Sequence, residues 1–341
     1  MKFQPTIEMQ WPSPSRWEVL SAIVSSIWLL RFGSKKNTEQ IEHTLKTLYG
    51  VEVKLFPSGR SAISGILSAM CFGRDKTVFI TKYSSFCLYQ SIGYRSNVST
   101  DFHSPQGVIV NHKWGKTNYD ERLPLNTELI IEDSCDSQIF GKRALFPNKG
   151  HFEIVSLTKV LGAISGAVVL INPQYSITKS FLDSSKSSKV ISYRQFFRKI
   201  RRLVSPQKNF GNLENEQVNW TLNALEVASI RFYVNRQPFI ENLMKDRIDR
   251  ISKLNNYYPC SFYRIGPGVV IKFASEKFLF DAHSFLAGSL IRHFDLSLTN
   301  DNFHVYEKVL FLPIHSKISS EMFEKNMKYL ENNQELIIRI L

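Results

Sequence analysis

Cysteine is scarce in this chain, and its spacing excludes the sites that cysteines usually build. The 341 residues contain four cysteines, none of them within a Cys-x-x-Cys pair: Cys71, Cys87, Cys135 and Cys260. Zinc knuckles and disulfide frameworks need closely spaced cysteines, so the sequence argues against both and favours a reducing compartment. We therefore expect a cytoplasmic protein, and we expect no metal site.

Long apolar runs are also missing. The longest uncharged apolar stretch is residues 19–30, whereas a helix that crosses a bilayer needs roughly 20 apolar residues. The first residues do not show the basic start and immediate apolar run of a signal peptide. We expect neither a membrane-spanning helix nor a secretory leader.

Acidic residues are too few to balance the basic ones. The chain has 43 Lys and Arg against 30 Asp and Glu, which gives a net charge of +13. Such a balance favours anionic partners, namely nucleic acid, an acidic membrane surface or phosphorylated ligands. The sequence has no zinc-finger spacing, basic zipper or aromatic RNA-binding signature, so we do not expect a nucleic-acid partner.

The chain does have the composition of a large folded protein. Its 43% hydrophobic and 13% aromatic residues are typical of globular proteins, and its length allows two domains. The expected helices are 17–32, 37–49 (with Asn37 or Thr38 as N-cap), 62–70 and 86–93, and the expected strands are 51–56, 77–81, 107–111, 128–132, 153–157 and 166–171. This alternation predicts an α/β fold with a mostly parallel sheet covered by helices on both faces.

The pattern changes after residue 173. Residues 193–203 place apolar side chains on one helical face and basic side chains around the rest. This segment is either a solvated basic helix packed on the body or a surface for anionic lipid or a phosphorylated substrate. A helical region at 220–256 should break at Pro238. Strand 269–274, helix 276–291, strand 309–312 and helix 319–330 then predict a small α/β domain over 246–341, after a large domain over 1–245.

Lys159 lies between two apolar segments, where a lysine is unfavourable unless its charge is neutralised or used. One use is a Schiff base with an aldehyde cofactor, because a desolvated lysine has a lowered pKa and is a better nucleophile. The alternative is a surface lysine in a loop between two strands.

Ser58, Gly59 and Arg60 lie where a strand turns into a helix. Free N–H groups and the positive end of the helix dipole suit a phosphate there, and the glycine lets the backbone approach closely. The alternative is an ordinary serine N-cap.

Asp133 ends a buried strand, where open α/β sheets place their ligands. A buried carboxylate needs a cationic partner, and a pyridinium nitrogen would serve; a helix cap is the alternative. Tyr83 and Phe86 follow another strand and could stack on a flat cofactor ring, although for either one alone the sequence favours a role in the core.

Taken together, these segments resemble the sugar aminotransferases of the DegT/StrS type, which are fold-type I enzymes that use pyridoxal 5'-phosphate (PLP). The resemblance covers nearly the whole chain through segments in the same order: 40–50 with 58–62, 108–115, 132–133, Lys159, 218–222 and 312–319. It implies a large domain with a mostly parallel, seven-stranded type of sheet and a small C-terminal α/β domain.

The resemblance also implies a role for each candidate residue. Lys159 would form the Schiff base and carry the proton during transfer, and Asp133 would keep the pyridine nitrogen protonated. Asn219 would reach the phosphate of the neighbouring subunit's cofactor, which requires a homodimer with shared active sites. The other implied contacts of the cofactor are Ser58, Gly59, Arg60, Ser156 and Thr158, the last two in a Ser-x-Thr-Lys run similar to that of the cystathionine-type PLP enzymes.

Some positions depart from the family pattern. Asp136 stands where the family usually has Gln or His, and its charge would repel the ring oxygen of the cofactor unless it is protonated or turned away. Gln138 could then take that role through a local shift. Arg60 replaces the threonine of the phosphate turn, and Thr221 replaces an arginine. We expect the chain to bind the cofactor despite these changes. The changes leave the identity of the substrate undetermined.

The implied function is an aminotransferase that takes an amino group from a glutamate-like donor and delivers it to a nucleotide-linked keto-sugar, as in polysaccharide biosynthesis. Two alternatives stay open. One keeps the cofactor but changes the chemistry to a lyase, a dehydratase or an aminotransferase for another small ketone. The other is a diverged, non-catalytic dimer that uses residues 193–203 to bind a membrane or another anionic partner.

Overall fold

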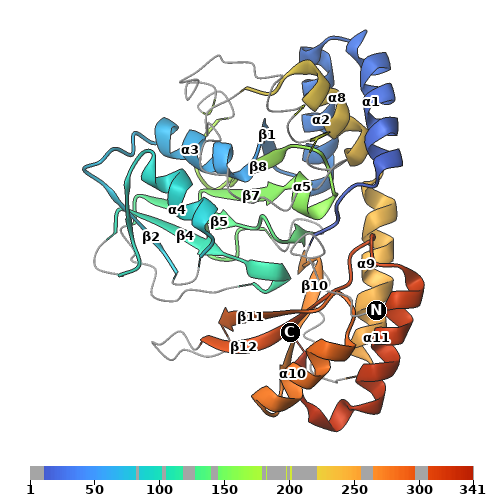
Figure 1. Ribbon diagram of the computed structural model, residues 1–341. Coiled ribbons are helices and arrows are strands. Elements are labelled where there is room, and N and C mark those ends of the chain that lie inside the picture. The colour runs from blue at the N-terminus through green and yellow to red at the C-terminus, as the bar shows by residue number, and fades with distance from the viewer. Residues whose placement is uncertain are drawn as a thin grey trace.

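Two β-sheets organise the chain, and Figure 1 shows the larger one above the smaller one. This computed structural model describes residues 11–81, 84–101, 105–117, 127–139, 145–178, 182, 197, 200–201, 221–254, 264–295 and 306–340. Within these residues, no helix has both the length and the apolar character that crossing a bilayer requires.

The larger sheet has seven strands in the order β1-β8-β7-β5-β4-β2-β3. β8 pairs antiparallel with β1 and β7, and every other pairing is parallel. The central strands are continuous apolar runs buried on both faces, as parallel sheets require. The strands are β1 (Glu52–Phe56), β2 (Thr77–Ile80), β3 (Asn97–Ser99), β4 (Gly107–Asn111), β5 (Leu129–Asp133), β7 (Phe152–Ser156) and β8 (Ala167–Ile171).

Helices cover both faces of this sheet. α3 (Gly59–Ala69) and α4 (Phe86–Gly93) pack on the face that carries Ile154 and Val169. α1 (Arg16–Leu30), α2 (Ser34–Tyr49) and α8 (Ala224–Val234) pack on the face that carries Val155 and Val168. Because side chains alternate along a strand, neighbouring residues of β7 and β8 contribute to two separate apolar layers.

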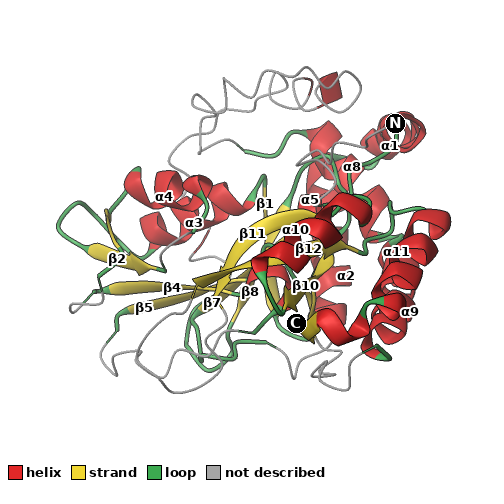
Figure 2. Ribbon diagram, turned by 60° about the horizontal axis from the view of Figure 1, so that its bottom comes forward, coloured by secondary structure: helices red, strands yellow, loops and turns green. Residues whose placement is uncertain are grey.

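The smaller sheet is antiparallel, in the order β11-β12-β10-β13. Its strands are β10 (Gly268–Phe273), β11 (Leu290–Asp295), β12 (Tyr306–Pro313) and β13 (Ile337–Ile340), and its helices are α10 (Glu276–Phe285) and α11 (Ser320–Asn332), with the short η5 (Gln334–Leu336). α9 (Gln237–Ser252) runs alongside in both ribbon views (Figures 1 and 2). Short strands β6 (Gln138–Ile139) and β9 (Arg264–Ile265) pair and join the two parts of the molecule.

The predicted α/β architecture is therefore confirmed. Two predicted elements are wrong in detail, and several strands were not predicted. α2 starts at Ser34 after Gly33, whereas Asn37 is buried inside the helix and donates to the carbonyl of Leu29 at 2.9 Å. The helix predicted over 276–291 ends at Phe285, because the chain turns and forms strand β11 instead. The strands that were not predicted are β3, β6, β9, β11 and β13.

The structure confirms one further prediction and leaves two others untested. The predicted break at Pro238 is confirmed, because α8 and α9 are separate helices and the proline lies in the first turn of α9. Of the predicted helix 193–203, the structure describes only Phe197, Ile200 and Arg201. The predicted domain division at residue 245 falls within α9 and stays a prediction.

Candidate active site

The candidate active site lies at the carboxyl edge of the large sheet. The sheet register places Phe56 opposite Ala167 and Ala167 opposite Ser156, so β1 and β7 end on either side of the start of β8. Asp133 at the end of β5 lies opposite Asn111. Open α/β sheets bind their ligands at this edge, where loops and helix N-termini meet.

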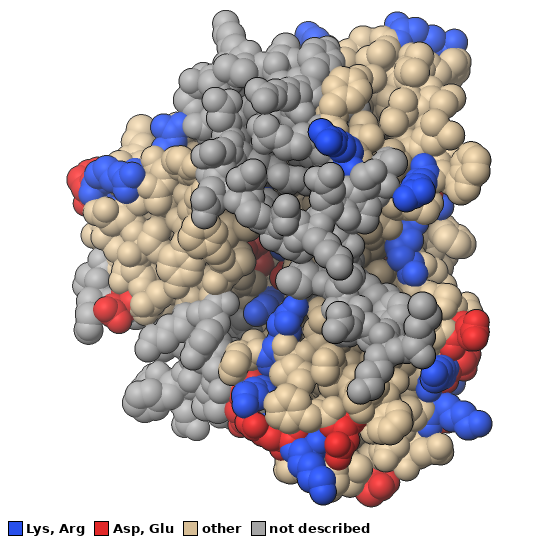
Figure 3. All heavy atoms as spheres, in the orientation of Figure 1, with Lys and Arg blue, Asp and Glu red and all other residues tan. Residues whose placement is uncertain are grey.

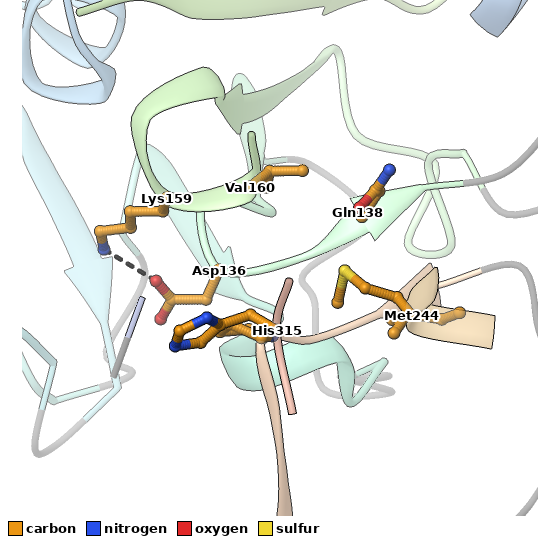
Figure 4. Close-up of a pocket in the computed structure, with 8 residues that line it drawn as sticks. Asp136, Gln138, Lys159, Val160, Met244 and His315 are labelled. Carbon is orange, nitrogen blue, oxygen red and sulfur yellow. Dashed lines mark hydrogen bonds and ion pairs between the residues drawn. The ribbon is translucent and has the colours of Figure 1, made fainter. Parts of the chain in front are cut away.

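Lys159 belongs to the short helix α5 (Leu157–Val160), directly after β7. Its Nζ donates to Oδ1 of Asp136 at 2.7 Å, and Figure 4 shows the two side chains pointing toward each other. The Lys159 side chain is 35% exposed and the Asp136 side chain 13%. Nζ also lies 4.8 Å from the centre of the Trp11 ring, a cation–π distance. The charge of Lys159 is thus neutralised.

This environment sets the protonation of the lysine. Burial alone would lower the pKa of Lys159, but the negative charge of Asp136 and the hydrogen bond to Asp136 raise it above its ordinary value. The sequence raised the possibility that Asp136 repels the cofactor. In the structure its carboxylate is turned toward Lys159 and accepts a hydrogen bond from it. Lys159 is therefore an ammonium ion until a ligand or a proton changes the pair.

Asp133 is the second charged group of the site. It is 8% exposed, and its Oδ1 accepts the backbone N–H of Cys135 at 3.1 Å. Burial raises the pKa of Asp133 by more than the hydrogen bonds from Cys135 and the charge of Lys159 lower it. A buried carboxylate in this state gains from a cationic N–H donor placed against it.

The N-terminus of α3 approaches Asp133 from the side. Ser58 caps this 11-residue helix, and its Oγ accepts the backbone N–H of Ser61 at 3.2 Å. Gly59 packs so closely on the turn after β5 that a Cβ at this position would lie 2.7 Å from Sγ of Cys135. The predicted phosphate turn and the predicted ring partner are therefore adjacent, and a side chain at position 59 would collide with the turn that holds Asp133.

Further predicted contacts line the same region. Oγ of Ser156 lies 2.9 Å from Oγ1 of Thr158. Both amide atoms of Gln138 are buried, and neither has a hydrogen-bond partner. Gln138 lines a small pocket together with Asp136, Lys159, Val160, Met244, Ile265, Pro267 and His315 (Figure 4). An unpaired buried amide is unfavourable, so Gln138 is available for a polar ligand.

A buried polar network holds the strand that presents Asp133. Nε2 of His112 lies 2.7 Å from Oε2 of Glu132, and both side chains are fully buried. Asn148 and Gly150 donate to the same carboxylate. Burial alone would raise the pKa of Glu132, but the bonds from His112, Asn148 and Gly150 lower it below its ordinary value. The resemblance pointed to the Glu132–Asp133 pair, and the structure shows that Glu132 supports the strand end.

A second network was missed by the sequence analysis. Arg264 of β9 pairs with Glu153 of β7 at 2.8 Å, and both side chains are almost completely buried. Ser134, the residue after Asp133, donates to Glu153 at 2.5 Å and contacts Arg264. An acidic residue inside an apolar strand signals a buried cationic partner. The sequence alone does not identify that partner, because 110 residues separate the two.

Lys113 adds a second basic side chain to the surroundings of Asp136. Lys113 belongs to the short 3-10 helix η2 (Lys113–Gly115), which follows β4. Burial lowers the pKa of Lys113, and the charges of Arg292 and Lys159 lower it further, whereas Asp136 opposes them. Two of these cations were not among the predicted site residues: Lys113 and Arg292. Together with Lys159 they make this region favourable for an anion.

Two of the remaining predicted residues lie within the described residues and two lie outside them. Phe86 begins α4 and is 69% exposed. Arg60 is the second residue of α3. Tyr83 and Asn219 lie outside the described residues. Within those residues, no group of three or more His, Cys, Asp and Glu side chains could hold a metal ion.

The residues present fit PLP. The site combines an amine, a buried carboxylate with a raised pKa, a helix N-terminus with serine hydroxyls, and a buried amide without a partner. Close packing against Cys135 requires a glycine at position 59, at the helix N-terminus that would hold the phosphate. These are the donors that an aldehyde, a pyridine nitrogen and a phosphate ester require.

Comparison with known proteins agrees with this geometry. A family model described as "Putative PLP-dependent aminotransferase" matches residues 41–333. No curated protein matches the chain at a significant level.

Several solved structures share the fold. A DegT/DnrJ/EryC1/StrS aminotransferase from Brucella abortus matches with a TM-score of 0.59 and 14% identity, over 94% of this chain and 97% of the other. A sugar aminotransferase from Streptococcus pneumoniae in its PLP form matches with a TM-score of 0.61 and 13% identity, over 98% of each chain. DesI, solved with its TDP-sugar product, matches with a TM-score of 0.61 and 11% identity, over 97% of this chain and 93% of the other.

Proposed function

Because this chain belongs to a family of PLP-dependent aminotransferases, we propose that it transfers an amino group from a glutamate-like amino acid to a nucleotide-linked keto-sugar. The family match supports the cofactor and the class of reaction. The structural neighbours include an aminotransferase solved with a TDP-sugar product, which supports the sugar substrate.

One observation carries the proposal. Lys159 and Asp133 lie at neighbouring strand ends of one sheet edge and affect each other's pKa, and the N-terminus of α3 packs against the turn after Asp133. An amine nucleophile, a carboxylate for a ring nitrogen and a phosphate site are thus gathered together. PLP, when bound, supplies an aldehyde that condenses with amines and a ring that accepts the electrons of the broken bond.

Each residue of the site then has a separate role in the proposed reaction. Lys159 is the amine that holds the cofactor and the base that moves a proton, and Asp136 takes up or returns the proton of its ammonium group. Asp133 accepts a hydrogen bond from the ring nitrogen and keeps it protonated. Ser58, Gly59 and Arg60 bind the phosphate at the start of α3.

The remaining contacts complete the proposal. Ser156 and Thr158 add hydroxyl contacts, and Gln138 contacts the ring oxygen that Asp136 does not reach. One of the aromatic residues Tyr83 and Phe86 stacks on the ring. Asn219 contacts the phosphate of a neighbouring subunit's cofactor, so we propose a homodimer with shared active sites.

The substrate assignment rests on charge. The charge of Lys113 interacts with those of Asp136 and Lys159, and Arg292 adds a second positive charge near Lys113. The carboxylate of an amino-acid donor and the diphosphate of a nucleotide sugar are both anions, and two half-reactions could use the same cations in turn. Synthesis of cell-surface polysaccharide is the process that would consume an amino-sugar nucleotide.

The absorption spectrum of the purified protein with added PLP tests the cofactor site. After excess PLP is removed, we expect the wild type to keep an imine band at longer wavelength than the band of free PLP and Lys159→Ala to lack it, because the imine needs the lysine amine. Lys253→Ala changes a lysine at the end of α9 and should leave the band unchanged. The absence of a band in the folded wild type would overturn the assignment.

Amino-donor dependence tests the reaction. Addition of glutamate should bleach the band, and a nucleotide-linked keto-sugar should restore it. A band that no amino acid bleaches would replace the aminotransferase proposal with the lyase or dehydratase alternative. Bleaching by glutamate with restoration only by small keto acids would retain the transfer and overturn the sugar substrate.

A further inference from the structure

The outer face of α1 exposes an unusual amount of apolar surface. Large apolar side chains at 17, 20, 24, 27 and 28 repeat at intervals of three and four residues, so they share one face of the helix. The exposed fractions are 76% for Trp17, 49% for Leu20, 60% for Val24, 61% for Ile27 and 55% for Trp28. Packing within the chain does not explain this face, because the opposite face of α1 carries the buried contacts.

That opposite face is well occupied. Val19, Ala22, Ser26 and Leu29 are the buried residues of α1, and the helix packs on α8. Both ribbon views place α1 at the periphery of the molecule (Figures 1 and 2). α1 therefore has two apolar faces, one that joins the core and one that faces outward. Soluble monomers rarely expose contiguous patches of this kind unless a partner binds there.

The charges around the patch are positive. Arg16, Arg31, Lys35 and Lys36 are exposed at the two ends of α1 and the start of α2. The guanidinium of Arg31 lies 3.5 Å from the centre of the Trp28 ring. On the side of the molecule that Figure 3 draws, the region over α1 and α8 shows Lys and Arg but no Asp or Glu.

The acidic residues nearby do not change this balance. Glu18 is the acid within α1, and its side chain is 18% exposed and bound to Arg236 and Lys317. Glu39 of α2 is exposed and faces Lys35 at 4.0 Å. Between Glu18 and Arg31, α1 has no charged residue at all.

We propose that the outer face of α1 (Trp17, Leu20, Val24, Ile27 and Trp28) docks on the surface of an anionic lipid bilayer. A helix of 15 residues is too short to span the membrane, so it would lie in the plane of the interface with its apolar side chains among the acyl chains. Trp residues near both ends suit the headgroup region, and the flanking Lys and Arg attract anionic headgroups.

The charge pattern favours lipid over a second copy of the chain. A symmetric contact through α1 would place the same surface of both copies face to face. It would bring the basic ends of the two helices together with few acidic residues to pair with them, which opposes association. An anionic bilayer complements both the apolar centre and the basic ends of this face.

Sedimentation with vesicles tests the proposal. The vesicles are phosphatidylcholine alone and phosphatidylcholine mixed with phosphatidylglycerol, and the protein is the intact wild-type chain. We expect it to sediment with the anionic vesicles and to stay in solution with the neutral ones. The double variant Val24→Glu/Ile27→Glu should reduce the bound fraction by about tenfold, since two carboxylates oppose both apolar insertion and the anionic surface.

A matched control separates this face from general positive charge. Phe239 on α9 and Phe285 on α10 are 64% and 65% exposed, so Phe239→Glu/Phe285→Glu makes the same charge change on other helices. This control should still sediment. Equal loss in both double variants would show that binding follows net charge, and equal retention in both would show that the outer face of α1 is not the contact. Either result would overturn the proposal.

Two further readouts complete the test. Tryptophan fluorescence should shift to the blue with anionic vesicles, and Trp17→Phe/Trp28→Phe should remove the shift while retaining most of the sedimentation. Light scattering would report a dimer that Val24→Glu/Ile27→Glu dissociates. Such a dimer in a wild type that does not bind vesicles would overturn the proposal and assign the face to a second copy of the chain.

Discussion

Asp136 holds Lys159 in a direct ion pair, with 2.7 Å between Oδ1 and Nζ. The carboxylate follows the strand end that presents Asp133, and the lysine follows the next strand of the sheet. The amine that the proposed reaction needs is thus stored in its protonated form, with its proton acceptor already in contact. In the sequence Asp136 looked unfavourable for cofactor binding. In the structure its negative charge compensates the partly buried positive charge of Lys159.

We expect Asp136→Asn to move the pH dependence of PLP binding to lower pH. Asp136 raises the pKa of Lys159, so the neutral amine becomes available only as the pH rises. Removing the negative charge leaves burial as the dominant effect and lowers that pKa. Spectrophotometric titration with PLP across a range of pH should show adduct formation beginning at a lower pH in the variant.

The control for this prediction is Asp249→Asn, which removes an exposed carboxylate on α9. It should leave the titration where the wild type has it. A pH profile of Asp136→Asn that superimposes on the wild type would mean that the ion pair does not govern the amine.

Gly59→Ala should weaken PLP binding and destabilise the fold by about 1–3 kcal/mol, because the added methyl group overpacks the contact with Cys135. The built Cβ would lie 2.7 Å from Sγ, and a shift of the sulfur would disturb its hydrogen bond to Asp133. Cys135→Ala removes the sulfur, so the double variant should recover much of the loss. Urea unfolding and PLP titration of the two single variants and the double variant measure this coupling.

Additive effects of the two substitutions would contradict this prediction. They would mean that the backbone at Gly59, and not its contact with the turn after β5, decides the stability of the site.

Glu132→Gln tests the buried network behind the site. The pKa of Glu132 is lowered in the folded chain, so its contribution to stability is full above its unfolded pKa and disappears as the pH falls through the folded value. We expect the variant to be less stable than wild type by about 1–3 kcal/mol at neutral pH. The difference should shrink progressively below about pH 4.5.

Urea unfolding of both proteins at a series of pH values gives the difference directly. Glu331→Gln, an exposed change on α11, should show no such pH-dependent difference. A gap between Glu132→Gln and wild type that stays constant on acidification would show that the carboxylate is not ionised in the folded state.

The sequence predicted six of the seven strands of the large sheet, because those strands are mostly apolar runs bounded by turns. It did not predict β3, which is short and carries polar residues at both ends. It did not predict β11, because the apolar spacing of α10 continues past Phe285 while the chain turns at Gly288, whose φ is +78°. β13 was missed for a related reason: its side chains alternate in burial only because it pairs with β10. Both strands depend on partners distant in sequence.

In the candidate site, too, some residues could be predicted from local sequence and others could not. Lys159 and Asp133 stand out locally, as a lysine and a carboxylate at the ends of apolar strands. The partnership of Asp136 with Lys159 and the cations Lys113 and Arg292 become visible only when η2, α5 and β11 are brought together. Sequence patterns identify charged residues whose burial is unfavourable, and the fold identifies the partners that compensate their charge.

Gln138→Leu should stabilise the protein without ligand and weaken its binding of PLP. Both amide atoms of Gln138 are buried without a partner, and replacing such a group with an apolar side chain of similar size should raise the free energy of unfolding by about 1 kcal/mol. If the amide serves the cofactor, the affinity for PLP should fall by about tenfold, which corresponds to one hydrogen bond of ordinary strength. Gln40→Leu, an exposed change on α2, should alter neither quantity. A variant that is stabilised but binds PLP as wild type does would remove Gln138 from the cofactor site and leave the pocket beside Lys159 for the substrate, because the unpaired amide would then face whatever enters after the cofactor.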